Sequence, residues 1–346
     1  MSVGVVASVS EPSVGVFVVA EPSSRARPAN GGLRLLPYAN DAAAVAEGVL
    51  LAERMALKHD LYATGFSGGK IVARASEPAS AKARVLRITR ALLDALDGGM
   101  LTGCDLNVSA ADMELLARRS PWVLAAVGHR VDASAATAHG VLGAFQASVA
   151  TLPGGPVERV VVHGIGAVGC VVAEELVARG YDVRTVDRDP SRTVAGALPV
   201  PAHRWAAEAA DAHVLCSATG LIDDVLAARL ATRLVVSGAN APFSSAGAEA
   251  ILAQRGARVL PDALANAGAV VVDSIEHYAR STWRRARPGD VYDFVRTLHR
   301  RKVALFWDRA ERERADDVLT RLRRDGATEE PVGRAFAPVT PARLAG

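Results

Sequence analysis

The sequence predicts an α/β protein built from two domains, and three observations lead to this fold class. The 346 residues exceed the usual length of one domain, and 50% of them are hydrophobic against 22% charged, which provides for buried cores. The second half alternates β-branched runs of strand length with alanine-rich runs of helix length, as parallel sheets covered by helices do. The first half has a different rhythm, with a long alanine-rich run between shorter apolar segments.

The elements of the first half follow from local patterns. Val14–Ala20 is a continuous, largely β-branched run that suits a buried strand. Asn40 and Asp41 favour a helix start, so the alanine-rich stretch is expected to be helical to about Leu57 and to bring Lys58 to its end. The other elements expected here are a strand at 70–75 and helices at 81–96, 112–118 and 133–150.

The second half begins after a turn rich in proline and glycine. This turn, Pro153–Pro156, closes the last of those helices and is the expected hinge. Beyond it the pattern predicts a helix ending near Arg179 and strands at 159–163, 183–186, 214–216, 234–237 and 259–260. We divide the chain into a first domain at residues 1–135, a second at 136–330 and a tail at 331–346. For the tail we expect either a poorly ordered end or a segment that packs back on the first domain.

Composition and charge argue against several classes of function. Net charge is +3, and the basic residues between positions 280 and 302 alternate with acidic ones, which favours a solvated helical face over nucleic-acid binding. No apolar run approaches the ~18 residues that span a membrane, and the N-terminus lacks the layout of a secretion signal. Cys104, Cys170 and Cys216 are widely spaced, so we expect reduced thiols, no metal site and a cytoplasmic location.

Lysine is scarce, and its placement is informative. Only Lys58, Lys70, Lys82 and Lys302 occur among the 40 basic residues, so the other 36 are arginines. Lys58 and Lys70 lie close together in the sequence, and glycines precede the second. A buried lysine can lose its proton near neutral pH and act as a base, which arginine cannot do. We interpret Lys58 and Lys70 as a candidate active site, with two ordinary surface lysines as the alternative.

A glycine turn in the second half marks another candidate site. Gly164-Ile165-Gly166-Ala167-Val168-Gly169 follows a predicted strand and begins a predicted helix, and Asp187 ends the next strand. This is the dinucleotide-binding fingerprint of a Rossmann-type doubly wound sheet, in which a pyrophosphate rests on the helix N-terminus. Asp187 can accept both ribose hydroxyls and would repel a 2′-phosphate, so NAD is preferred. Arg188 leaves NADP as the less favoured alternative.

Further motifs surround these two candidate sites. In chain order they are Gly31-Gly32-Leu33-Arg34, Met55-x-x-Lys58 with Ser67-Gly68-Gly69-Lys70, Asp105 followed by Asp112-Met113, the glycine fingerprint, and a last group of Ala218-Thr219-Gly220, Gly238-Ala239-Asn240 and Pro261–Gly268. In this order and spacing the motifs resemble those of the amino acid dehydrogenases of the glutamate, leucine, phenylalanine and valine type, from about residue 14 to about residue 277.

The resemblance implies a role for each matched residue. Lys58 would bind the substrate α-carboxylate beside the backbone of Gly31 and Gly32. Lys70 would be the general base that activates water, and Asp105 would shuttle a proton to and from the amino group. The implied cofactor contacts are Gly164, Gly166, Ala167, Val168, Gly169, Asp187, Arg188, Ala218, Thr219, Asn240 and Asn266, the last also reaching the substrate region. Structural alternatives are an ion pair with a lysine for Asp105 and a helix or turn cap for Asn266.

Some positions depart from the family pattern. Ser67 and Ala269 stand where glycines are usual, and Asn107 stands where a small residue is usual. The first helix, which often takes part in assembly, is missing from the pattern because the first predicted strand begins near Val14. The resemblance implies a homo-oligomer, and we expect a smaller assembly such as a dimer instead of the familiar hexamer or octamer.

The side-chain pocket departs most. The family positions that line it are Asn30 and Asp273 here, where glutamate dehydrogenases have lysine and serine and leucine dehydrogenases have leucine and valine. Gly103 adds room. An aliphatic substrate would leave two buried polar groups unpaired at a cost of about 1–3 kcal/mol each. We therefore expect a polar substrate side chain. The alternative is that Asp273 turns away to cap a helix or to pair with an arginine.

These interpretations combine into one expectation. The chain should be an α/β enzyme with its site in a cleft between an N-terminal substrate domain and a C-terminal Rossmann-type domain. It should convert an L-amino acid into a 2-oxo acid and ammonia with NAD, reversibly. Two alternatives stay open: a nucleotide-binding regulator or scaffold without catalysis, and another nicotinamide oxidoreductase that acts on imines or cyclic amines.

Overall fold

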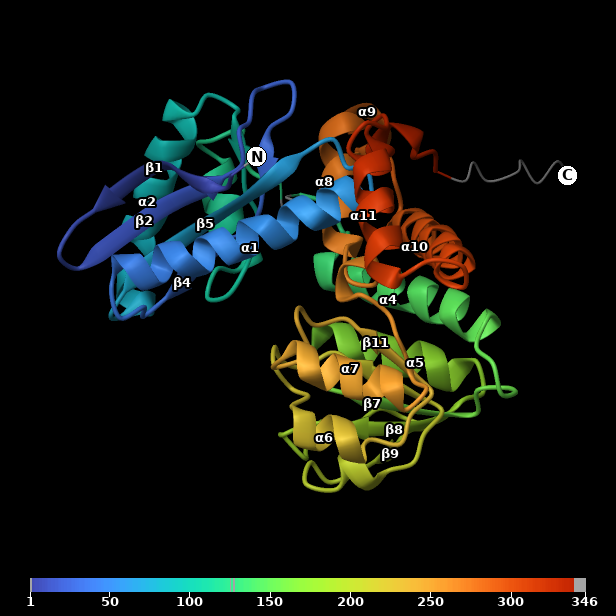
Figure 1. Cartoon of the computed structure of the whole chain (residues 1–346). Coiled ribbons are helices and arrows are strands. Elements are labelled where there is room, and N and C mark those ends of the chain that lie inside the picture. Colours follow the sequence, from blue (N-terminus) through green and yellow to red (C-terminus); the bar gives the residue numbers. More distant parts are fainter. Residues whose placement is uncertain (1, 125, 127, 339–346) are drawn as a thin grey trace, which may run out of the picture. The chain divides into compact units, whose positions relative to one another are not determined.

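The computed structural model describes residues 2–124, 126 and 128–338, which form two compact units. One unit contains the described residues up to Arg130 together with Val270–Arg285 and Thr320–Ala337, and the other contains Val131–Ala269 and Ala286–Leu319 (Figure 1). The division therefore differs from the expected single crossing after residue 135, since two later segments return to the first unit. Pro153–Pro156, the expected hinge, lies within the second unit.

Hydrogen bonds between distant segments explain these returns. The Ser274 hydroxyl donates to the Thr64 carbonyl at 2.7 Å, and Arg323 pairs with Asp60 at 2.9 Å. In the tail, the amide of Val332 donates to the carbonyl of Ala63 at 2.7 Å, so residues 331–337 pack on the first unit. Residues 339–346 of the tail lie outside the described residues.

The described part of the first unit contains a six-stranded mixed sheet. Its strands in spatial order are β1 (Gly4–Ser10), β2 (Val14–Ala20), β5 (Ser67–Ala75), β3 (Ala29–Asn30) and β6 (Met100–Leu101), and β4 (Leu33–Leu36) also pairs with β5. The pairs β1 with β2 and β2 with β5 are antiparallel, whereas β3 and β4 run parallel to β5. β5 is thus the central strand of this unit.

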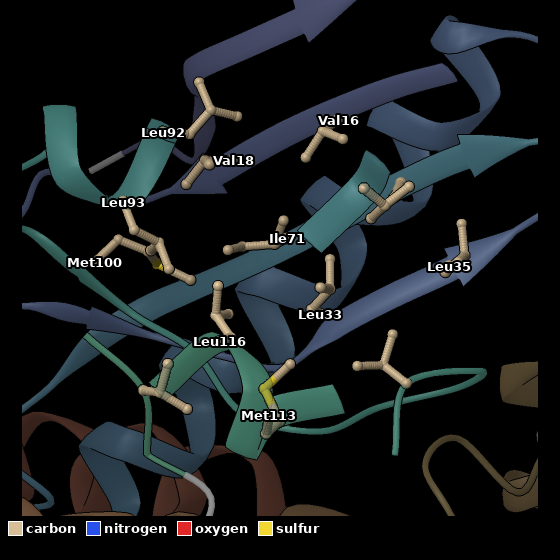
Figure 2. Packing of buried hydrophobic residues seen from close by; sticks show 14 of the residues in the cluster. Val16, Val18, Leu33, Leu35, Ile71, Leu92, Leu93, Met100, Met113 and Leu116 are labelled. Carbon is tan, nitrogen blue, oxygen red and sulfur yellow. The ribbon is translucent and has the colours of Figure 1, made fainter. Parts of the chain in front are cut away.

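Helices cover both faces of this sheet. On one face α2 (Pro78–Ala95) and α3 (Ala110–Ala117) pack on Val16 and Val18 of β2 and Ile71 of β5, as Figure 2 shows. On the other face α1 (Asp41–Leu61) packs on Val19 and Val72. Strands buried on both faces are apolar at every position, which explains the continuous apolar run of β2.

The second unit is a parallel sheet with helices. Its strands in spatial order are β12 (Arg258–Val259), β11 (Leu234–Ser237), β10 (Ala212–Leu215), β7 (Arg159–His163), β8 (Asp182–Val186) and β9 (Leu198–Pro199), all parallel. The helices of this unit are α4 (Ala133–Ala150), α5 (Ala167–Ala178), α6 (Asp224–Arg229), α7 (Ala246–Gln254) and α10 (Pro288–Ala310). The strand order reverses at β7, so the carboxyl ends of β7 and β10 flank the place where such sheets bind ligands. The expected Rossmann-type fold is confirmed.

Three helices remain: α8 (Gly268–Tyr278), α9 (Arg280–Trp283) and α11 (Ala315–Gly326). Residue 270 onward of α8, all of α9, and α11 from Thr320 belong to the first unit. Among the described residues, every helix is too short or too polar to cross a bilayer.

Several boundaries differ from the predictions by one to four residues, and the structure adds a strand before the first predicted one. The first strand begins at Gly4 instead of near Val14, because β1 is a half-exposed edge strand whose alternating pattern is weaker than that of buried β2. α1 continues to Leu61, so Lys58 lies within its last turn instead of at its end. β2, β7, β11 and α4 begin and end at the predicted residues.

Candidate active site

At the centre of the first unit, two glycines allow neighbouring backbone segments to lie in direct contact. Gly31 and Gly32 connect β3 to β4, which pair with successive parts of β5. A β-carbon on Gly31 would lie 1.8 Å from the Gly69 carbonyl oxygen, and one on Gly32 would lie 2.5 Å from the Cys104 carbonyl oxygen. Glycine is required at both positions because neighbouring backbone segments of the same polypeptide approach them so closely. The turn thereby places β5 next to the segment that carries Asp105.

The carboxylate of Asp105 joins three segments of the first unit. It forms an ion pair with the Lys70 ammonium of β5. The Arg34 guanidinium of β4 donates from Nε to Oδ2 at 2.9 Å and from Nη2 to Oδ1 at 3.3 Å, and the Leu106 amide donates to Oδ1 at 2.7 Å. Glu47 of α1 in turn accepts from Arg34 at 2.5 Å. The lysine ion pair considered for Asp105 is present, and its partner is the other predicted catalytic residue.

The side to which these groups point follows from strand periodicity. Residues two apart on a strand share a face of the sheet, so Lys70 lies on the same face as Val72, which packs on α1. Arg34 lies between Leu33 and Leu35, which belong to the core on the α2 and α3 face, and therefore also points toward α1. Polar groups of the site thus gather on the α1 face of the sheet.

Burial and charge act in opposite directions on the Lys70–Asp105 pair. Lys70 is 6% exposed, and burial lowers its pKa below the ordinary value although the charge of Asp105 opposes this shift. Burial would raise the pKa of Asp105, but the charges and hydrogen bonds of Lys70 and Arg34 outweigh it and lower that pKa to about 2. A lysine of lowered pKa beside a fixed carboxylate is an arrangement suited to a general base.

Lys58 is also buried, at 8% exposure. α1 lies tightly on β5, because a β-carbon on Gly68 would meet the carbonyl oxygen of Ala52 at 2.3 Å. The residue after Lys58 is His59, whose Nε2 lies 3.1 Å from the carbonyl oxygen of Asn30. Burial lowers the pKa of His59 to about 3, so its ring is neutral. His59 therefore links the end of α1 to the strand that carries Asn30.

The structure brings Asn30 and Asp273 together. Asn30 Nδ2 donates to Asp273 Oδ2 at 3.1 Å. Burial raises the pKa of Asp273 well above its usual value, and the charge of Glu276 raises it further. Burial together with the charge of Asp273 also raises the pKa of Cys104, the neighbour of Asp105, to about 11. The observed partner of Asp273 is Asn30 instead of the arginine of the alternative.

Glu276 is a polar residue that the sequence interpretation missed. It follows Asp273 by three residues on α8 and so lies on the same side of the helix, a spacing that could have identified it. Its Oε2 accepts from the Ala126 amide at 3.0 Å. Burial raises the pKa of Glu276 to about 7, although the Ala126 amide and the charge of Arg280 oppose this. The side chain lines a cavity of about 390 Å³ whose walls include Trp283.

Gly103 and Asn107 have backbone roles near the same segment. The Gly103 carbonyl accepts from the Leu33 amide at 2.9 Å, which joins this segment to the start of β4. Asn107 has φ of 61°, a conformation that asparagine tolerates better than most residues, and its side chain donates to the Leu35 carbonyl at 2.9 Å. The departure from a small residue at position 107 therefore fits the turn.

In the second unit, the glycine turn follows β7 and begins α5. Gly164 has φ of 93°, and a β-carbon there would lie 2.6 Å from the β-carbon of Ser217. A β-carbon on Gly169 would lie 1.8 Å from the Gly164 carbonyl oxygen, so helix and strand can approach only because both are glycines. Gly166 is the N-cap of α5 and provides no side-chain cap, which leaves the first amides, including those of Ala167 and Val168, available to an anion.

Asp187 ends β8 beside this turn. Its Oδ2 accepts from the Ile165 amide at 2.7 Å and its Oδ1 accepts from the Asp189 amide at 3.0 Å. Burial would raise the pKa of Asp187, but these hydrogen bonds and the charge of Arg192 outweigh it and lower that pKa below its usual value. The group is therefore a fixed carboxylate at the end of the strand. Arg188, the next residue, is exposed.

Two loops at the carboxyl ends of neighbouring strands complete the second unit's site. Ala218 and Thr219 follow β10, and the Thr219 hydroxyl donates to the Asn240 carbonyl after β11 at 3.0 Å. Asn266 Nδ2 donates to the Ala239 carbonyl at 3.1 Å and to Asn240 Oδ1 at 3.2 Å. Asn266 thus ties loops together instead of capping a helix. Its Oδ1 is buried and has no hydrogen-bond partner among the described residues.

The chemistry available to each unit is distinct. The first unit offers buried lysines, a fixed carboxylate and a polar group of Asn30, Asp273 and Glu276. The second offers a glycine-lined helix N-terminus beside a carboxylate, which fits a dinucleotide. Among the described residues no group of three or more histidine, cysteine or acidic side chains could bind a metal ion.

Comparison with family models agrees with both units. The description "Glutamate/Leucine/Phenylalanine/Valine dehydrogenase" matches residues 191–330. The description "Glu/Leu/Phe/Val dehydrogenase, dimerisation domain" matches residues 18–129. Together these matches cover most of the chain.

Individual proteins show the same likeness. The chain is 30% identical to valine dehydrogenase of Streptomyces albus over 292 residues, which is 80% of each protein. It is 29% identical to phenylalanine dehydrogenase of Caldalkalibacillus thermarum over 287 residues, 78% of this chain and 77% of the relative. The crystal structure of L-tryptophan dehydrogenase from Nostoc punctiforme has the same fold, with a TM-score of 0.75 at 21% identity, covering 94% of this chain and 95% of the other.

The opposing influences on Lys70 generate a prediction about its pKa. Asp105→Asn removes the charge that raises this pKa and leaves the burial that lowers it, so the pKa of Lys70 should fall below its value in the parent protein. Nuclear magnetic resonance of a chain labelled with ¹³C-lysine is suited to the measurement, because only four ε-carbon signals occur, and the one missing in Lys70→Arg belongs to Lys70. An unchanged or higher titration midpoint in Asp105→Asn would contradict the interpretation.

Proposed function

The chain belongs to the glutamate/leucine/phenylalanine/valine dehydrogenase family, and from this membership we propose that it is an NAD-dependent L-amino acid dehydrogenase whose substrate has a polar side chain. Membership makes it an oxidoreductase that acts on CH–NH₂ groups with a nicotinamide cofactor. The proposed reaction converts an L-amino acid, water and NAD⁺ into a 2-oxo acid, ammonium, NADH and a proton, and it is reversible. The observation that supports it most is the buried ion pair of Lys70 with Asp105.

Lys70 is the proposed general base. A bound nicotinamide would supply the acceptor for the hydride of the substrate α-carbon, and the substrate would thereby become an imine. Water then attacks the imine carbon, and Lys70 takes a proton from that water as the new C–O bond forms. Burial supports this role because it lowers the pKa of Lys70 and so increases the fraction of the unprotonated amine.

Asp105 and Lys58 have separate proposed tasks. Asp105 is the proposed carrier of a proton between the substrate amino group and the departing ammonia. Lys70 and Arg34 lower its pKa to about 2, so the carboxylate is charged at rest and holds that proton only transiently. Arg34 positions Asp105 through two hydrogen bonds. Lys58 is the proposed partner of the substrate α-carboxylate, with the backbone of Gly31 and Gly32 shaping the space. These assignments are supported by the burial of both lysines.

NAD is the proposed cofactor. The N-terminus of α5 would receive the pyrophosphate at Gly166, and Asp187 would accept hydrogen bonds from the ribose hydroxyls. Because the carboxylate of Asp187 is charged and fixed by two amides, it would repel a 2′-phosphate. Thr219, Asn240 and Asn266 would contribute the remaining contacts.

The proposed substrate carries a hydrogen-bond donor on its side chain, and a cationic group fits best. Burial raises the pKa values of the carboxyl groups of Asp273 and Glu276, and Asn30 donates a side-chain hydrogen bond to Asp273. A substrate ammonium would offset the cost of burying these two groups in their charged forms and the effect of the Glu276 charge on Asp273. An isobutyl side chain would instead bring these two groups no further hydrogen-bond donor.

Two other functions predict different behaviour. A scaffold without catalysis would not require the buried arrangement of Lys70, Asp105 and Arg34, and it would form no NADH with any amino acid. An oxidoreductase that acts on cyclic amines would not require ammonia in the reductive direction. The match to a dimerisation domain supports a homo-oligomer, for which we propose a dimer and which sedimentation analysis can test.

Lys70→Ala should lose most turnover while retaining NADH binding. Removal of one well-placed base typically lowers the rate on the order of 10²–10⁴-fold. Turnover is measured as NADH absorbance and binding as NADH fluorescence. Lys82→Ala is the matched control. Lys82 forms its ion pair with Asp112, at 3.0 Å, and is not a member of the Lys70–Asp105–Arg34 cluster. A Lys70→Ala enzyme within threefold of the parent would exclude Lys70 as the base.

Asp187→Ser should shift cofactor preference toward NADP. The substitution removes the carboxylate that accepts the ribose hydroxyls and repels a phosphate, so affinity for NADH should fall and relative affinity for NADPH should rise. Dissociation constants from fluorescence titration of both cofactors provide the measurement. A parent enzyme that already prefers NADPH would show that the role assigned to Asp187 is wrong.

Asp273→Val combined with Asn30→Leu should move preference from polar toward branched aliphatic amino acids. The ratio of kcat/KM for leucine to that for lysine should rise on the order of 10–100-fold, because the substitutions remove two buried polar side chains that an isobutyl group cannot pair with. L-lysine and L-norleucine form the sharpest pair for the parent, since they differ mainly by the terminal amine.

Glu276→Gln provides the matched variant for the same prediction. Glutamine can still accept from the Ala126 amide but carries no charge, so preference for lysine over norleucine should fall without loss of folding. A parent that uses leucine or valine best would contradict the polar pocket, while NADH formation with that substrate would leave the dehydrogenase assignment intact.

A further inference from the structure

The open side of the glycine turn has a guanidinium facing it. Gly166 is the second glycine of the turn and the N-cap of α5. Apart from its chain neighbours, the only described atom within 4 Å of the position of a β-carbon on Gly166 is Arg192 Nη1, at 3.9 Å. The second glycine of such turns is where a pyrophosphate approaches the backbone. A diphosphate bound there would therefore lie beside Arg192.

Arg192 is only loosely engaged in its present contacts. Nη1 donates to the Ile165 carbonyl at 3.4 Å, and Nε lies 3.6 Å from Asp189 Oδ2. Both distances are longer than those of strong hydrogen bonds. The side chain is 52% exposed. Since a guanidinium has five N–H donors, several remain available to a ligand.

The backbone of Arg192 is nevertheless fixed by a short turn. Asp189 Oδ1 accepts from the Ser191 amide at 3.0 Å and from the Ser191 hydroxyl at 2.6 Å. The Arg192 amide donates to the Asp189 carbonyl at 3.2 Å. This turn follows β8 and directs Arg192 back toward the glycine turn after β7. The backbone position of Arg192 is thus set before any ligand binds, which lowers the entropic cost of using its side chain.

The acidic residues beside the glycine turn also favour a cation at this place. Asp187 and Asp189 both have lowered pKa values, Asp187 through its backbone hydrogen bonds against the effect of burial and Asp189 through its bonds from Ser191, so both are negative. A diphosphate would add two more negative charges, whereas the N-terminus of α5 supplies about half a positive charge. Without a cation the site would disfavour the cofactor that its backbone fits.

We infer that Arg192 is a cofactor-binding residue that clamps the diphosphate of the dinucleotide against the N-terminus of α5. The inference rests on the proposed use of a nicotinamide dinucleotide. It adds a residue that the glycine fingerprint does not contain. Because NAD and NADP have the same diphosphate, Arg192 contributes equally to both.

Fluorescence titration of Arg192→Ala with NADH and with NADPH tests the inference. Loss of a charge-assisted contact to phosphate should weaken both cofactors by a similar factor, on the order of tenfold. Arg192→Lys keeps the charge but loses the planar fork and should lie between Arg192→Ala and the parent. The salt dependence of NADH affinity should be smaller in Arg192→Ala, because a charged contact to phosphate has been removed.

The control removes the same charge at the other end of α5. Arg179 is the C-cap of that helix and pairs with Glu175 at 3.6 Å, so Arg179→Ala should leave NADH affinity unchanged. The inference would be overturned if Arg179→Ala weakened cofactor binding as much as Arg192→Ala does, or if Arg192→Ala left both affinities unchanged. It would also be overturned if Arg192→Ala weakened the binding of NADPH alone, because Arg192 would then contact the 2′-phosphate. Thermal melting curves exclude misfolding of the variants. A parent that binds neither cofactor would instead refute the proposed function itself.

Discussion

The first unit depends on one interaction, the carboxylate of Asp105 held between Lys70 and Arg34. Lys70 is nearly fully buried, and a buried ammonium is stable only beside a compensating charge. Arg34 brings a second cation to the same carboxylate and is itself balanced by Glu47 of α1. The cluster joins β4, β5, α1 and the segment after β6. Removing one member would leave its partners buried without compensation, so structure and chemistry cannot be separated here.

Glycines make that cluster possible. The two residues between β3 and β4 lie so close to β5 and to the Cys104 carbonyl that no β-carbon fits. Gly68 performs the same task between β5 and α1. These contacts place a strand, a helix and a loop within reach of one carboxylate. The second unit uses glycine in the same way, where Gly169 packs on the carbonyl of Gly164 and lets the N-terminus of α5 face an anion.

The two units treat their acidic residues differently. In the second unit Asp187 is satisfied by two backbone amides, and its pKa is lowered. In the first unit burial raises the pKa of both Asp273 and Glu276, and the charge of Glu276 raises the pKa of Asp273 further. A charged carboxylate that backbone amides hold in place can discriminate between ligands, because it accepts hydrogen bonds from hydroxyl groups and repels phosphate groups. A pair of strained carboxyl groups instead favours a ligand that brings a donor, which is the physical basis of the proposed polar substrate.

The sequence by itself determined the elements that depend on local pattern. The continuous apolar run of β2, the caps and alanine content of α1 and α4, and the strand–glycine–helix order of β7 and α5 are each readable within some twenty residues, because periodicity and turn chemistry are local properties. The motifs also identified Lys70 and Asp105. Only the tertiary structure decided that α8 and most of the last helix return to the first unit, that Glu276 accepts from the Ala126 amide, and that Arg192 faces Gly166. Such relations depend on contacts between residues far apart in the chain, and neither propensity nor spacing carries information about which distant segments meet.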